Sequence, residues 1–131
     1  MKRVIAVVLF ISILTVGAYI ISRDQPGFNI TIKNQTNKNI SDLKITYQNI
    51  TSDIEIPSIQ PKEEYKLKVT PTEEFGENTM KLLYTDDKGT LHTKTVIGYF
   101  EQGYSGESMI TLQAIDTKGV IQMDIKEELF N

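Results

Sequence analysis

Apolar and polar side chains alternate with a period of two from residue 28 onward, and this pattern constrains the fold more than any other feature of the chain. Ile30 and Ile32, for example, flank the polar Thr31. Because successive side chains of a β-strand point to opposite faces, each such segment predicts a strand with one face buried and one in solvent. The pattern recurs about eight times, in residues 30–32, 43–47, 54–56, 65–69, 80–84, 91–100, 110–114 and 121–125.

The breaks between these segments carry turn residues. The sequences DDKG, from Asp86, and DTKG, from Asp116, are nearly the same turn used twice. Aspartate can accept hydrogen bonds from the backbone of such a turn, and glycine supplies the positive φ at its end. Since no helical period follows residue 22, the sequence predicts an all-β fold: a single antiparallel immunoglobulin-like β-sandwich of about eight strands. A small β-barrel is the alternative.

The first 23 residues differ in character from the rest. An apolar run from Val4 to Ile21 follows Lys2 and Arg3, and as a helix it would reach about 27 Å, close to the hydrocarbon thickness of a bilayer. We therefore expect residues 1–23 to form a signal-anchor or transmembrane segment, residues 24–27 a linker, and residues 28–131 one β-sandwich domain. The alternative is a signal peptide that is cleaved after Ala18, which would give a secreted protein.

The charges around this run predict its orientation. Lys2 and Arg3 precede the run, whereas Arg23 follows it beside Asp24. An excess of cationic residues on one flank favours the cytoplasmic side for that flank. We expect a single-pass membrane protein with a cytoplasmic N-terminus and an extracellular C-terminal domain.

The charge of the domain excludes several partners. The chain has a net charge of −3, and arginine is absent after Arg23. An acidic domain repels nucleic acid, and without arginine it lacks the fork that usually grips phosphate. We therefore expect no nucleic-acid and no nucleotide partner, and contact with the membrane only through Val4–Ile21.

Catalytic and metal-binding motifs are incomplete. Cysteine is absent and His92 is the sole histidine, so neither a zinc site nor a Ser-His-Asp triad is expected, and His92 is interpreted as an exposed strand residue. The glycines around Ser105 match neither a phosphate-binding loop nor a hydrolase elbow. The acidic run from Pro71 to Asn78 lacks the spacing of a calcium loop, and we expect Phe75 to lie under it. No catalytic residue, metal or cofactor is predicted.

The segment Gly98–Gly106, with sequence GYFEQGYSG, is the strongest candidate for a recognition surface. Aromatic residues are enriched in binding surfaces, so Tyr99, Phe100, Glu101 and Tyr104 are the predicted partner-binding residues. Two readings stay open: the aromatics cap the core, or some of them face solvent. We expect a long loop in which Tyr104 is the most exposed aromatic, and in which Tyr99 and Phe100 point to opposite faces.

These features predict a membrane-anchored extracytoplasmic β-sandwich that acts as a non-enzymatic binding or accessory protein of the cell envelope. Its partner would be a protein or another envelope component. The alternative from a different class is a small extracytoplasmic hydrolase that uses paired carboxylates.

Overall fold

The computed structural model describes residues 26–130, and within them the chain folds into eight strands at the places where the alternation predicts them. The first strand begins at Gly27, one residue before the predicted domain boundary. The strands are β1 (Gly27–Asn34), β2 (Leu43–Tyr47), β3 (Ile54–Ile56), β4 (Glu64–Val69), β5 (Asn78–Thr85), β6 (Leu91–Phe100), β7 (Ser105–Ile115) and β8 (Ile121–Phe130).

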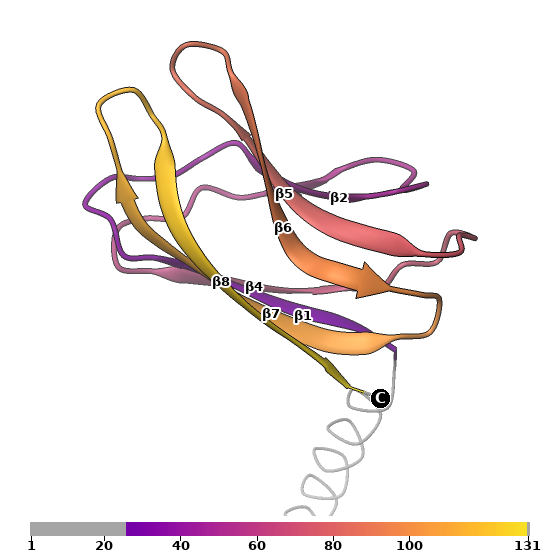
Figure 1. Cartoon of the computed structure of the whole chain (residues 1–131). Coiled ribbons are helices and arrows are strands. Elements are labelled where there is room, and N and C mark those ends of the chain that lie inside the picture. The colour runs from indigo at the N-terminus through magenta and orange to yellow at the C-terminus, as the bar shows by residue number, and fades with distance from the viewer. Residues whose placement is uncertain (1–25, 131) are drawn as a thin grey trace, which may run out of the picture.

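The strands form two four-stranded sheets, with the orders β4-β1-β7-β8 and β3-β2-β5-β6. Figure 1 shows the two sheets as separate layers. This arrangement fits an all-β sandwich, and it differs from the single closed sheet of a barrel. The core lies between the layers, where the inward residues of both sheets are fully buried, among them Ile32, Ile45, Leu82, Ile110 and Leu112.

One strand pair departs from the expected antiparallel arrangement. β1 and β7 run parallel, with Gly27 opposite Ser105 and Asn34 opposite Leu112. Alternation predicts which face of a strand is buried, but it carries no information about which distant strand lies alongside. The long stretch of chain between β1 and β7 supplies the crossover that a parallel pair needs.

β6 does not keep a strict alternation. Its pairing with β5 shifts register on either side of Met80, so β6 contains bulges. A bulge places an extra residue on one strand and changes which side chains face inward. As a result Val96 and Ile97 are both buried, and beyond them Tyr99 faces outward while Phe100 faces the core.

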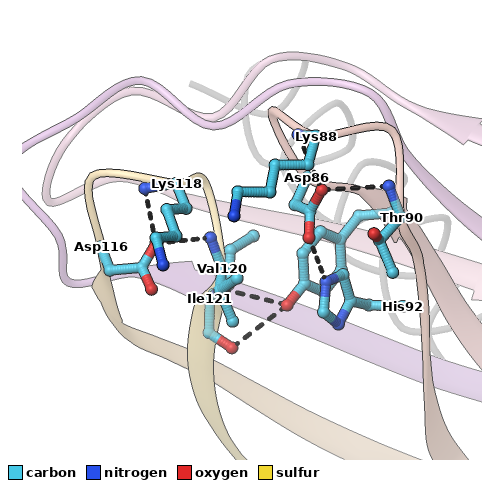
Figure 2. A network of polar contacts seen from close by, with 9 residues as sticks. Asp86, Lys88, Thr90, His92, Asp116, Lys118, Val120 and Ile121 are labelled. Carbon is cyan, nitrogen blue, oxygen red and sulfur yellow. Dashed lines mark hydrogen bonds and ion pairs between the residues drawn. The ribbon is translucent and has the colours of Figure 1, made fainter.

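The turns at Asp86 and Asp116 are the repeated hairpin turns that the sequence predicts. The Asp86 Oδ1 atom accepts hydrogen bonds from the N–H groups of Lys88 and Thr90 at 2.9 and 3.0 Å. Asp116 accepts the two corresponding bonds at 2.8 and 2.9 Å (Figure 2). Each turn ends in a glycine with a φ of 82°.

The sandwich has two distinct ends. The tips of the β5–β6 and β7–β8 hairpins stand side by side at one end, which we call the hairpin end (Figure 1). The other end, here the loop end, carries the start of β1 at Gly27 and the connections 70–77 and 101–104.

The predicted membrane span, Val4–Ile21, and its linker up to residue 25 lie outside the described residues. Within residues 26–130, no helix is long and apolar enough to cross a membrane.

Candidate binding surface

Phe100 seals the core at the loop end and is not accessible to a partner. Its side chain is fully buried. Its ring packs edge-on against Phe28 and Phe75, with centroid separations of 4.9 and 5.4 Å, and against Tyr47 at 6.2 Å. Phe75 lies under the 70–77 connection, as the sequence predicts. The expected partner-binding role of Phe100 is therefore replaced by a structural one.

Tyr99, the neighbour of Phe100, is the exposed aromatic of this segment, with 42% of its surface accessible. Its hydroxyl donates a hydrogen bond of 2.6 Å to the Glu101 carboxylate. This bond raises the pKa of Tyr99 from 10.0 to about 12, and burial and the negative charge of Glu101 act in the same direction. The ring is thus held in one orientation by a charged acceptor.

Tyr104 was expected to be the most exposed aromatic, and this expectation is wrong. The ring is half-buried against the core and lies edge-on to Tyr99 at 6.2 Å. The physical reason is the length of the connection, which is a tight turn rather than a long loop. The Tyr104 N–H donates to the Glu101 carbonyl oxygen at 3.2 Å, Gly103 has a φ of 82°, and β7 begins directly afterwards at Ser105.

Glu73 organises the loop end, although the sequence gives no sign of it beyond the acidic run. Its carboxylate accepts hydrogen bonds from the Tyr47 hydroxyl at 2.7 Å and from the Thr51 and Thr72 N–H groups at 3.3 and 3.2 Å. The bond from Tyr47 is the main cause that lowers the pKa of Glu73 below 4.5. Burial, and then the hydrogen bond to Glu73, raises the pKa of Tyr47. The backbone carbonyl oxygen of Glu73 accepts a hydrogen bond from the Gln102 side chain, so the 70–77 connection is tied to the turn that follows Tyr99.

An open groove of about 570 Å³ lies beside Tyr99, where β2 ends and β5 begins. β5 forms its floor, β2 lies on one side and β6 on the other. We call it the polar groove, and it is lined by Thr46, Tyr47, Gln48, Glu77, Asn78, Thr79, Lys81 and Tyr99.

Half of the groove-lining residues are held by hydrogen bonds. Asn78, which is only 5% exposed, accepts from the N–H groups of Gln48 and Thr79 at 2.9 Å and donates to the Gln48 carbonyl oxygen at 2.9 Å. The Thr79 hydroxyl donates to the Gly98 carbonyl oxygen at 3.1 Å. Tyr47 is held by Glu73 and Tyr99 by Glu101. These bonds fix the wall of the groove.

The other half are uncommitted. Within residues 26–130, the side chains of Thr46, Gln48, Glu77 and Lys81 make no hydrogen bond or ion pair. Together they present hydroxyl, amide, carboxylate and ammonium groups to solvent in the groove. Sequence reasoning missed these residues because they come from different strands.

His92 lies at the opposite end of the molecule and differs from its expected role. It is half-buried rather than exposed, and its ring stacks on Tyr84 at 4.8 Å. Its Nε2 atom lies 2.8 Å from Asp86 Oδ2, and this hydrogen bond is the main cause that lowers the pKa of Asp86 (Figure 2). The Tyr84 hydroxyl in turn accepts from the Ile121 N–H at 3.0 Å, so this cluster joins the two hairpins.

No group of three or more histidine, cysteine or acidic side chains within residues 26–130 is placed to hold a metal ion. No family model matches the chain, and no curated protein matches it. Among solved structures, the chain is similar to one described as the NMR structure of the protein from Eubacterium rectale, with a TM-score of 0.47 and 15% sequence identity. The similarity covers 76% of this chain and 87% of that chain.

Proposed function

We propose that the protein is a membrane-tethered, extracytoplasmic binding module that recognises an envelope partner through the polar groove and Tyr99. The observation that carries this proposal is the combination of a fixed, exposed tyrosine with an open groove of about 570 Å³ whose remaining polar side chains have no partner within residues 26–130. The volume of the groove falls in the range of about 300–1,000 Å³ that is typical of small-molecule sites, in which a few placed polar groups orient the ligand.

The tether in this proposal is the apolar run Val4–Ile21, with residues 24–131 outside the cytoplasm. β1 starts at the loop end, so a tether that precedes Gly27 would hold this end toward the membrane. The domain is a β-sandwich of two four-stranded sheets. It places β1 beside β4 and β7, and so does not follow the ABED and CFG sheets of immunoglobulin constant domains.

Binding without catalysis is supported by the charges of the groove. Glu77 is the one carboxylate among the lining residues. Hydrolysis of a glycosidic bond by paired carboxylates needs two carboxyl groups, one on each side of the bond. The alternative of a carboxylate-dependent hydrolase gains no support from this surface.

The location can be tested with a single cysteine, because the chain has none of its own. Leu91 is 62% exposed at the hairpin end, so Leu91→Cys offers an accessible thiol that leaves the groove unchanged. We expect a membrane-impermeant maleimide to label Leu91→Cys in intact cells, and the labelled protein to sediment with membranes. Labelling only after the cells are permeabilised would contradict the extracytoplasmic location, and labelled protein in the medium would contradict the tether.

A further inference from the structure

The polar groove offers side chains, and not backbone, to a ligand. Its floor strand β5 is paired on both edges, with β2 and with β6, so an added peptide strand has no free backbone groups to join there. Thr46 of β2 lies directly opposite Lys81 of β5, and Thr79 lies two residues before Lys81 on the same face. A ligand over β5 is therefore recognised by side chains and not by strand addition to β5.

The chemistry of the lining argues against a protein partner in the groove itself. None of its eight lining residues is aliphatic. The centre of a protein–protein interface is usually apolar and depleted of charged residues. The lining here carries hydroxyl and amide groups, with Lys81 and Glu77 as one charge of each sign. The carboxylates of Glu73 and Glu101, which are bonded to the hydroxyls of Tyr47 and Tyr99, add negative charge beside the groove, so a polyanion is disfavoured there.

The remaining groups match a hydroxyl-rich ligand. Thr46 and Gln48 can both donate and accept hydrogen bonds, Lys81 can donate, and Glu77 can accept. Tyr99 adds an aromatic wall whose hydroxyl is already bonded to Glu101, so its ring is ordered before a ligand arrives. Preorganised aromatic surface costs little conformational entropy on binding.

We propose that the polar groove binds a neutral sugar chain, a proposal that rests on the binding function proposed above. The hydroxyl groups of a pyranose would pair with the uncommitted side chains Thr46, Gln48, Glu77 and Lys81. The C–H face of the ring would pack on Tyr99. The groove is open to solvent, so it does not enclose a single sugar and leaves room for the chain to continue beyond it.

The test uses the purified full chain and two neutral probes, a chito-oligosaccharide and a cello-oligosaccharide, with binding followed by calorimetry or NMR titration. We expect at least one probe to bind, and Tyr99→Ala to weaken that binding by roughly tenfold or more. Leu91→Ala, an exposed apolar residue at the other end of the molecule, is the matched control and should bind as the wild type does. Circular dichroism should show both variants folded, because both side chains are exposed.

Failure to bind either neutral probe, or equal binding by Tyr99→Ala, would overturn the sugar proposal. Tighter binding of an oligolysine or oligoglutamate peptide at the groove would overturn it as well. These results leave the wider binding function standing if the groove is still covered in intact cells, because a partner other than a neutral sugar chain then occupies it. If the groove is also uncovered in intact cells, both the sugar proposal and the proposed binding function fail.

Discussion

Phe100→Ala is expected to lower the free energy of unfolding by about 3–5 kcal/mol, the range for removing a fully buried phenylalanine. The ring of Phe100 is fully buried and contacts the rings of Phe28, Tyr47 and Phe75. Its loss leaves a cavity at the loop end that these neighbours can refill only in part. The edge-on ring contacts are lost in addition to the buried area.

Chemical denaturation of Phe100→Ala and of its neighbour variant Tyr99→Ala measures this effect with a matched control. Tyr99 is 42% exposed, so Tyr99→Ala should stay within about 1 kcal/mol of the wild type. Equal losses in the two variants would contradict the placement of Phe100 in the core and Tyr99 on the surface.

Asn78→Ala is expected to cost roughly 2–4 kcal/mol, through unpaired backbone groups rather than through a cavity. Asn78 is buried at the start of β5, where its side chain binds the backbone of Gln48, the residue directly after β2. It bonds both the N–H and the carbonyl oxygen of Gln48, and it accepts from Thr79. Alanine would leave these backbone groups without partners at the edge of the polar groove.

Asn78→Asp separates the contributions of these bonds. Aspartate keeps the two acceptor contacts to N–H groups and loses the donor to the Gln48 carbonyl oxygen, so its cost should be smaller than that of alanine at neutral pH. Asn39→Ala, at an exposed position, is the control and should change stability by less than about 0.5 kcal/mol. Unchanged stability in Asn78→Ala by thermal or chemical unfolding would mean that water replaces all three bonds.

The strands and hairpin turns could be predicted because their signals are local. Alternation such as Ile30-Thr31-Ile32 requires only that one face be buried, and the eight strands lie where it occurs. The turns at Asp86 and Asp116 could be predicted for the same reason, since their aspartate and glycine act on backbone groups within four residues.

The surface near Tyr99 could be predicted only in part. The opposite faces of Tyr99 and Phe100 follow from strand geometry, and the structure confirms them. Which of the two faces inward depends on the bulges of β6, which the sequence does not mark. Tyr104 was misjudged because the turn after Glu101 is shorter than its two glycines suggest.

The polar groove could not be predicted from the sequence. It exists because β5 lies between β2 and β6, which brings Thr46 beside Lys81 and both near Tyr99. Strand order of this kind depends on contacts between residues far apart in the chain, as does the parallel pairing of β1 with β7. The hydrogen bond between Glu73 and Tyr47 likewise joins the 70–77 connection to the end of β2, which no local pattern connects.

Thiol footprinting in intact cells tests most directly whether the polar groove is the binding surface. Gln48→Cys places a thiol in the groove, and Leu91→Cys places one at the hairpin end. We expect a membrane-impermeant maleimide to modify Gln48→Cys several times more slowly in cells than in the purified protein, because the partner covers the groove. Leu91→Cys should react at similar rates in both settings. Equal reactivity of Gln48→Cys in cells and in the purified protein, or slower reaction at Leu91→Cys alone, would contradict the assignment.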